Sequence, residues 1–167
     1  ATLAELKAYL RIEASEEDAL LAGLLRAGQG YCEQFVGQWL IEREARETGA
    51  AERAWVRLAA RPVVSIEHVE GIDAAGATVP LGAGDYAIDI DGRGEGWVRA
   101  TGPIAAGRLR VTYRAGMAQD MNGLPDAIRH GIVRIAAEHH AARATGQPSV
   151  PAVVAALWRP WRRMRLA

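Results

Sequence analysis

Arg108-Leu-Arg-Val-Thr-Tyr-Arg114 is the stretch of sequence that decides the fold. Apolar residues at 109, 111 and 113 alternate with arginines and a threonine. A period of two is typical of a β-strand with one buried face and one wet face. The stretch therefore predicts a strand whose inner face is apolar and whose outer face is strongly cationic.

A long core helix is expected after this strand, beyond a break at Gly116. It is predicted to open at Leu124-Pro-Asp126, because the first turn of a helix tolerates the missing N–H of proline. The apolar side chains that follow recur at three- and four-residue spacing, which predicts one face packed against the core. The residues of this face are Ile128, Ile132, Ile135, Ala136 and His139.

Two further helices are predicted at the start of the sequence, over residues 3–10 and 16–36. Thr2 and Glu5 have the spacing of a capping box, in which each side chain satisfies the other residue's backbone N–H. Ser15-Glu-Glu-Asp18 repeats this signal and adds three acids, which the dipole of a first turn favours. Glycines at 23, 28 and 30 weaken the second helix, and close packing of a neighbour would explain them.

The region 39–115 is predicted to be an antiparallel β-meander, because short alternating stretches are separated by Gly and Pro. A strand starting at Trp39 is expected to pair with Ala54–Leu58. The predicted fold class is α+β: a small helical bundle around a central antiparallel β-meander. The bundle comprises the two N-terminal helices, a long helix over 124–144 and a C-terminal tail helix. The predicted division is a domain over 1–145 and a linker with tail over 146–167.

Composition sets broad limits on the function. The 167 residues carry 20 basic and 20 acidic side chains, so no net field attracts nucleic acid or an anionic membrane. From Asp126 onward, seven arginines against two acids give a basic end of net charge +5. A single cysteine, Cys32, and the lack of a long apolar run or a signal peptide favour a protein made and kept in a cytoplasm.

No catalytic, cofactor or metal site is predicted. Asp85, Asp89, Asp91 and Glu95 resemble a calcium loop in composition but not in ligand spacing, and strand-edge acids beside a hairpin turn are favoured. Glu138, His139 and His140 with His130 lack zinc-ligand spacing, because adjacent helical residues point about 100° apart. Ser65, Ser149 and Cys32 have no nucleophile motif and no evident base.

The C-terminal tail is the strongest candidate for function. After the linker Gly146–Pro151, a helical run is expected to end or kink near Pro160. Its tryptophans either fold back on the domain or, as favoured here, contact a partner, because Trp and Arg dominate binding hot spots. On the favoured interpretation, deleting residues 151–167 leaves a folded domain. The candidate partner-binding residues are Val153, Leu157, Trp158, Arg159, Trp161, Arg162, Arg163 and Arg165.

The sequence resembles the head–tail connector, or adaptor, proteins of long-tailed phages, prophages and gene transfer agents. The order and spacing of several short motifs carry the resemblance over nearly the whole chain. These motifs are Leu3-x-x-Leu-Lys-x-x-Leu-Arg-Ile12, Glu16-Glu-Asp-x-Leu-Leu21, Arg61-Pro-Val-Val-Ser-Ile66, Asp85-Tyr86, Val111-Thr-Tyr-Arg-Ala-Gly116, Leu124-Pro-x-x-Ile128 and Pro151-x-Val-x-x-Leu-x-x-Pro-Trp-Arg162.

The resemblance implies a structural protein without catalysis. Its subunits would form a ring, commonly of twelve, beneath the capsid portal, and DNA would pass non-specifically through the channel. The implied partners are other copies of the chain, the portal protein and a tail-side stopper or terminator protein, with no membrane. The implied location is the head–tail interface of a virion or phage-like particle assembled in a bacterial cytoplasm, with the tail residues inserted between portal subunits.

A second hypothesis of a different class remains. The basic tail could make the chain a DNA-binding accessory protein, because Arg contacts phosphate and Trp stacks on bases. The neutral total charge counts against it.

Overall fold

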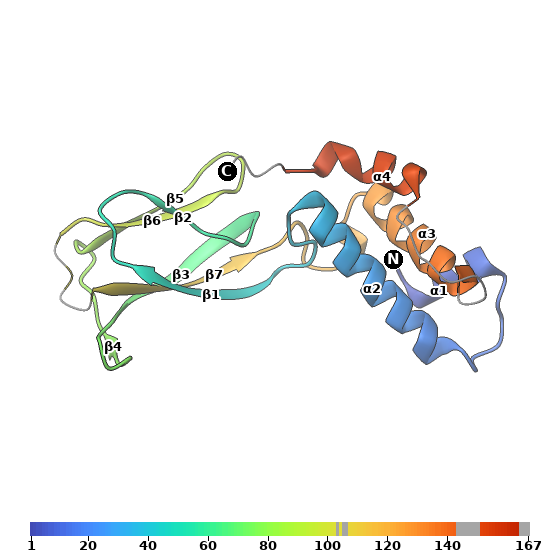
Figure 1. Ribbon diagram of the computed structural model, residues 1–167, viewed down its shortest axis with the longest axis horizontal. Coiled ribbons are helices and arrows are strands. Elements are labelled where there is room, and N and C mark those ends of the chain that lie inside the picture. Colours follow the sequence, from blue (N-terminus) through green and yellow to red (C-terminus); the bar gives the residue numbers. More distant parts are fainter. Residues whose placement is uncertain (103, 105–106, 143–150, 164–167) are drawn as a thin grey trace. The chain divides into compact units, whose positions relative to one another are not determined.

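The computed structural model describes residues 1–102, 104, 107–142 and 151–163. The chain divides into two compact units, labelled in Figure 1 by their elements. The helical unit comprises Ala1–Leu40 and Ala118–Ala167, and the sheet unit comprises Ile41–Met117. Within the described ranges, no helix is both long and apolar enough to cross a membrane. The predicted α+β class is confirmed, with helices in one unit and antiparallel strands in the other.

The first helix, α1, spans Leu3–Leu10, as predicted. The capping box is present: the Glu5 N–H donates to Thr2 Oγ1 over 3.2 Å, and the Thr2 N–H donates to Glu5 Oε2 over 2.6 Å. The helix ends at Arg11, whose φ of 58° reverses the chain. The capping box, a local sequence signal, thus sets the start of this helix.

The second helix, α2, spans Asp18–Val36 and begins two residues later than predicted. Ser15 does not cap it with its side chain; instead the Ser15 carbonyl accepts from the Asp18 N–H over 3.1 Å. Asp18 itself contacts Lys7 Nζ of α1 at 2.7 Å. Asp18 therefore joins α2 to α1, and the helix starts without a side-chain cap.

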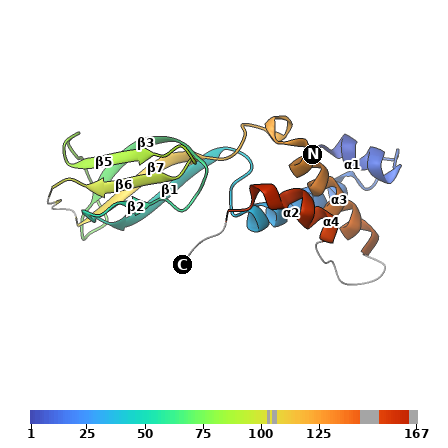
Figure 2. The ribbon, with the colours of Figure 1, turned by 90° about the horizontal axis from the view of Figure 1, so that it is seen from above.

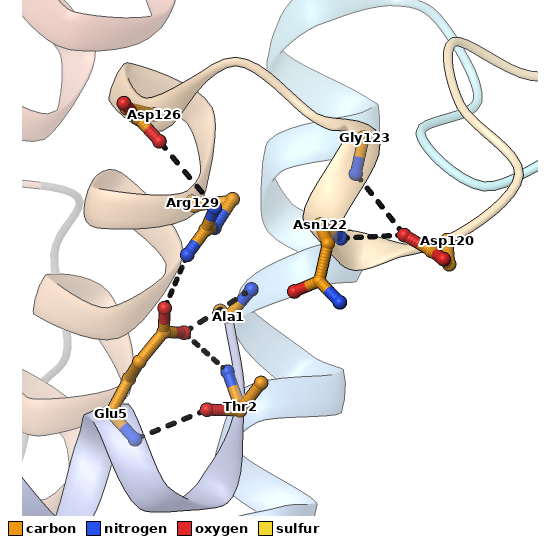
Figure 3. Close-up of polar contacts among 8 residues, drawn as sticks. All are labelled: Ala1, Thr2, Glu5, Asp120, Asn122, Gly123, Asp126 and Arg129. Carbon is orange, nitrogen blue, oxygen red and sulfur yellow. Dashed lines mark hydrogen bonds and ion pairs between the residues drawn. The ribbon is translucent and has the colours of Figure 1, made fainter.

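The long helix, α3, spans Asp126–Ala142 within the predicted 124–144; residues 143 and 144 lie outside the described ranges. A short 3-10 turn, η1 (Met121–Gly123), precedes it, and the Asp120 carboxylate caps this turn (Figure 3). The side chains of α3 form the core of the helical unit. Its buried residues are Ile128, Gly131, Ile132, Val133, Ile135, Ala136 and Ala137.

Gly28 lies where α2 and α3 pack closely against each other. A Cβ built there would lie 2.9 Å from Ile135 Cγ2 and 3.2 Å from the Ile132 carbonyl oxygen. At Gly30, by contrast, a Cβ would have nothing within 4 Å. Close packing of a neighbour thus explains Gly28 but not Gly30.

These two glycines give a matched pair of alanine substitutions. Gly28→Ala should lower the free energy of unfolding by about 1–3 kcal/mol, because the extra methyl group overpacks the α2–α3 contact. Gly30→Ala should raise it by up to about 1 kcal/mol, since alanine favours the helix and meets open space. Urea denaturation of both variants measures the difference. Equal effects at the two positions would contradict the packing argument.

The described residues of the sheet unit form seven strands. Four of them form a sheet in the order β1-β7-β3-β4, and three form a sheet in the order β2-β6-β5, with all pairs antiparallel (Figures 1 and 2). Their bounds are β1 Arg43–Ala50, β2 Val56–Arg57, β3 Val63–Ile72, β4 Thr78–Val79, β5 Tyr86–Ile90, β6 Gly96–Ala100 and β7 Arg108–Ala115. The first strand pairs with the last, Arg43 opposite Ala115, so its expected pairing with Ala54–Leu58 is wrong. The latter segment contributes β2, which pairs with β6 instead.

The central strand β7 alternates as predicted. Leu109, Val111 and Tyr113 are buried, and Thr112 on the other face is buried as well. The outer face is not strongly cationic, however, because the flanking strands place Glu44 opposite Arg114 and Glu70 opposite Arg110. Arg114 also donates to Glu42 Oε1 over 2.6 Å. This face therefore carries mixed charges.

The break at Gly116 has a steric cause. Its φ is 151°, and a Cβ there would overlap the backbone nitrogen of Glu42. The Gly116 N–H donates to the Pro62 carbonyl over 2.8 Å. The end of β7 is thus held between two other segments of the sheet unit.

Two networks stabilise the loops of the sheet unit. The Tyr113 hydroxyl contacts the Glu47 carboxylate and accepts from the Ala60 N–H over 2.9 Å. Burial raises the pKa of Tyr113, and the hydrogen bond to Glu47 raises it further. In the second network, Glu95 contacts Arg57 Nη1 and Arg61 Nη1, each at 3.0 Å.

The β5–β6 hairpin turn depends on Asp91. Its Oδ1 accepts from the Glu95 N–H over 2.9 Å and from the Arg93 N–H over 2.8 Å. These two backbone hydrogen bonds lower the pKa of Asp91, because they favour the charged carboxylate. Of the acids that resemble a calcium loop in composition, Asp91 thus shapes this turn, Asp85 accepts from the Gly82 N–H over 2.7 Å, and Glu95 pairs with arginines.

The lowered pKa makes a pH-dependent contribution to stability. The carboxylate of Asp91 stabilises the folded state above its unfolded-state pKa, and this contribution is lost as pH falls through its lower folded-state pKa. Asp91→Asn should therefore be less stable than the wild type at pH 7, and the difference should shrink under acid. Thermal denaturation between pH 7 and pH 2 measures this, with Asp89→Asn as the charge-matched control. A difference that does not change with pH would contradict the assignment.

Candidate interaction site

The C-terminal segment, residues 151–163, is part of the folded helical unit. It forms α4 (Ala152–Trp158) and one 3-10 turn, η2 (Arg159–Trp161), so the α-helix ends beside Pro160 as predicted. Val154 and Trp158 lie four residues apart on one face and are fully buried. This face packs against α3 and α2. Val154 and Trp158 therefore fold back on the domain and are not available to a partner.

Trp158 occupies a site on α3 that only glycine can form. Its indole ring lies against Gly131, where a Cβ would be 2.7 Å from Cε2 of the ring. The indole N–H donates to the Ile128 carbonyl over 3.3 Å, and the Phe35 ring centroid lies 5.9 Å away. The large apolar surface and the single polar group of this tryptophan are thus both accommodated inside the unit.

Residues after Trp158 bind the C-terminal end of α2. The Arg163 N–H donates to the Val36 carbonyl over 2.8 Å, which satisfies one of the free carbonyls at the end of the helix. Gln38 Nε2 donates to the Trp161 carbonyl over 2.6 Å. The Arg162 guanidinium lies 5.4 Å from the centroid of the Phe35 ring. The segment is therefore held along its whole described length.

The predicted partner-binding residues consequently fall into different environments. Val153, Arg159, Arg162 and Arg163 are exposed, Leu157 and Trp161 are half-buried, and Trp158 is fully buried. Arg165 lies outside the described residues. An accessible Trp158, which the favoured interpretation expects, is thus not observed. Any partner that contacts this segment meets its outer side.

The outer side of the segment is chemically simple. It carries three exposed arginines and no acid, since residues 151–163 contain neither Asp nor Glu. Such a surface suits carboxylates or phosphates. The DNA-binding hypothesis invoked base stacking by tryptophans of the tail; Trp158 is not available for it because its ring is buried.

A second polar site lies between α1 and α3 (Figure 3). Arg129 contacts Glu5 and approaches Asp126 Oδ1 at 3.4 Å, beside the capping box of α1. A shallow cavity of about 180 Å³ is lined by Glu5, Tyr9, Asp126, Arg129, His130 and Val133. Sequence analysis missed it because Glu5 and Arg129 are separated by 124 positions. The same Glu5 side chain joins the helix cap to α3, which indicates a structural role.

His139, His140 and Cys32 each lie in a packed or ion-paired environment inside the helical unit. His139 packs edge-on against Tyr31 at 5.3 Å, and His140 Nε2 lies 3.0 Å from Glu17 Oε2. Cys32 is fully buried, and burial raises the pKa of its thiol, with a smaller contribution from the charge of Glu33. Among the described residues, no group of three His, Cys, Asp or Glu side chains could hold a metal ion.

Comparisons with known proteins point to one kind of assembly. No protein-family model and no curated protein matches the chain. Among solved structures, a chain of the neck of an empty GTA particle, computed with C6 symmetry, is 27% identical with a TM-score of 0.81. The match covers 100% of this chain and 91% of that one.

Two further structures agree. A chain from the virion of a native gene transfer agent (GTA) particle is 26% identical with a TM-score of 0.78, covering 100% of this chain and 91% of that one. A chain from the neck of a native GTA particle, computed with C12 symmetry, is 27% identical with a TM-score of 0.78, covering 99% and 90%. This chain is therefore similar over essentially its full length to chains of gene transfer agent particles and their necks, which supports a structural neck component.

Proposed function

We propose that this chain is a head–tail connector subunit that forms a ring beneath the portal of a phage-like particle, joins head to tail and lets DNA pass. The observation that carries the proposal is the full-length similarity to neck chains, which includes both the helical unit and the sheet unit. Two of these necks were computed with C6 or C12 symmetry, which suits copies arranged around an axis. The proposed role is structural and involves no reaction.

The outer side of the C-terminal segment is the proposed portal-facing surface. Its arginines, Arg159, Arg162 and Arg163, would meet carboxylates, and Val153, Leu157 and Trp161 supply apolar area beside them. Trp158 acts differently from its predicted role: it holds the segment on α3, so that the arginines in and after the 3-10 turn are presented from a fixed backbone. A pre-organised surface loses less conformational entropy on binding than a mobile tail.

Mass measurement in solution tests the proposal. The purified chain should form complexes of several 18.0 kDa subunits, either alone or on its portal, where the mass added to that of the portal should be a multiple of 18.0 kDa. A chain that stays monomeric both alone and with the portal would overturn it. A tail-side stopper or terminator should bind only the assembled ring.

Charge reversal tests the portal-facing surface. Arg159→Glu combined with Arg162→Glu and Arg163→Glu should abolish portal binding, while Arg26→Glu, an exposed arginine on α2, should not. If the triple variant keeps portal binding but loses salt-dependent binding to duplex DNA, the DNA-binding hypothesis takes its place.

A further inference from the structure

The three-stranded sheet of the sheet unit has two edges that are apolar and partly exposed. On its inner face, Val56 of β2, Val98 of β6 and Ile88 of β5 form one row of directly opposed residues. Val98 in the middle is 5% exposed, whereas Val56 is 39% and Ile88 is 44% exposed. The other sheet thus covers the centre of this row and leaves both ends in water.

More apolar surface lies beside each end of the row. Ile90, two residues from Ile88 on the same face, is 38% exposed, and Trp55, next to Val56, is 43% exposed. Arg99 lies 4.8 Å over the Trp55 ring. Among the described strands, β2 and β5 each pair only with β6. Exposed apolar strand edges of this kind are ready to associate with another chain.

The two edges carry opposite charges. The β5 edge is acidic, with Asp89 between the two isoleucines and Asp85 and Asp91 at either end of the strand. The β2 edge is basic, with Arg53 and Arg57 on either side of Trp55 and Val56. Both arginines are exposed, but Arg57 already pairs with Glu95 at 3.0 Å, so Arg53 is the arginine of this edge that we expect to meet an acid of another copy. Each edge therefore complements the other in both polarity and charge.

We infer that the β5 edge of one copy binds the β2 edge of the next. Ile88 and Ile90 would pack against Trp55 and Val56, and Asp89 would face Arg53. Because the two contacting surfaces differ, the interface is heterologous and repeats from copy to copy until the rotation closes a ring. This inference deepens the proposed function by naming the surfaces that join neighbouring subunits, and it rests on that function for the ring.

Cross-linking between introduced cysteines tests the interface directly. Ala54→Cys lies on the β2 edge and Ala87→Cys on the β5 edge, and both leave the charged residues in place. The native Cys32 is fully buried and will not react in the folded chain. With a short thiol cross-linker, each single variant can give dimers at most. The double variant should give a ladder of multiples of the subunit, the signature of a head-to-tail interface.

Two controls make the result specific. Ala54→Cys with Thr78→Cys, where Thr78 lies on β4 away from both edges, should give no ladder. Asp89→Arg added to the double variant should reduce the ladder about tenfold, because like charges then meet across the interface. Adding Arg53→Asp as well should restore it, since the pair is then reversed.

The outcomes distinguish failure of the β5–β2 interface from failure of the proposed connector function. A ladder with restoration by the reversed pair supports the interface. Absence of the ladder, or an equally strong ladder from the control pair, overturns the interface. If the chain still binds the portal and reaches the mass of a ring, only the interface is wrong, whereas a chain that never assembles overturns the proposed function too.

Discussion

Trp158→Ala is expected to lower the free energy of unfolding of the helical unit by about 3–5 kcal/mol, the usual cost of truncating a buried tryptophan. The ring is fully buried, lies against Gly131 and donates to the Ile128 carbonyl over 3.3 Å. Its removal leaves a cavity between α3 and α4 that backbone contacts alone cannot close. Urea denaturation, monitored by far-UV circular dichroism and not by tryptophan fluorescence, measures the loss of stability.

Trp161→Ala is the matched control, because Trp161 is half-buried and lies three residues further along the same segment. It should cost much less than Trp158→Ala. Gly131→Ala should reproduce part of the large loss from the other side of the contact, because its methyl group displaces the indole ring. Equal effects of the two tryptophan variants would contradict the buried position of Trp158.

The same contact changes the expectation for a truncated chain. The sequence suggested that deleting residues 151–167 leaves a folded domain, whereas the structure leads us to expect a destabilised helical unit. The deletion would expose the surfaces of α2 and α3 that Val154 and Trp158 cover. Loss of portal binding by such a truncation would therefore not identify a binding surface, and charge reversal on the outer side is the better test.

Glu95→Gln is expected to destabilise the sheet unit by about 3 kcal/mol, the lower end of the cost of breaking a buried ion pair. Arg61 is 7% exposed, and the Glu95 carboxylate contacts it at 3.0 Å. The variant keeps the shape of the side chain but removes a negative charge that helps to offset burial of the guanidinium. The same carboxylate also contacts Arg57, so one substitution weakens two contacts between the β5–β6 hairpin and the residues around β2.

Glu44→Gln provides the comparison. Glu44 and Arg46 form a surface pair at 3.5 Å, with both side chains more than half exposed. Exposed pairs of this kind contribute about 0–1 kcal/mol, so this variant should be nearly neutral. Thermal denaturation of both variants at low and high salt measures the contrast. A neutral Glu95→Gln would show that the sheet unit does not depend on the buried charge.

Local signals in the sequence predicted local structure well. The capping box of Thr2 and Glu5 gave the bounds of α1, and the alternation over 109–113 gave the buried face of β7. Both features depend on residues a few positions apart, so the interactions that determine them lie within the segment itself. The Ser15 signal was less accurate because Asp18 contacts Lys7 of another helix, a partner that spacing alone does not show.

Long-range pairing was the part that the sequence could not provide. Half of the residues of β1 are charged, and nothing in its pattern indicates that its partner is β7 rather than the nearer segment 54–58. The environment of Trp158 was missed for a similar reason, since Trp and Arg suit a core and a binding surface equally well. Gly131 was the available signal: a glycine one turn from Ile128 and from Ile135 inside a long helix indicates that something packs closely there.

The pairing of β1 with β7 has a consequence for how the chain folds. The helical unit is interrupted by the 77 residues from Ile41 to Met117, so its helices α2 and α3 are far apart in sequence. Because Arg43 lies opposite Ala115, a folded sheet unit brings its own two ends together, and Ala118 then donates to the Leu40 carbonyl over 3.1 Å.

A sheet unit that has already folded acts as a short turn between α2 and α3. Loop closure costs roughly 0.6 kcal/mol per doubling of loop length, so shortening the loop from about 80 residues to a few saves about 2 kcal/mol. The loop-closure entropy therefore favours folding of the sheet unit before α2 docks on α3. The sheet unit separates α2 and α3 in the sequence, but once folded it lowers the entropic cost of bringing these two helices together.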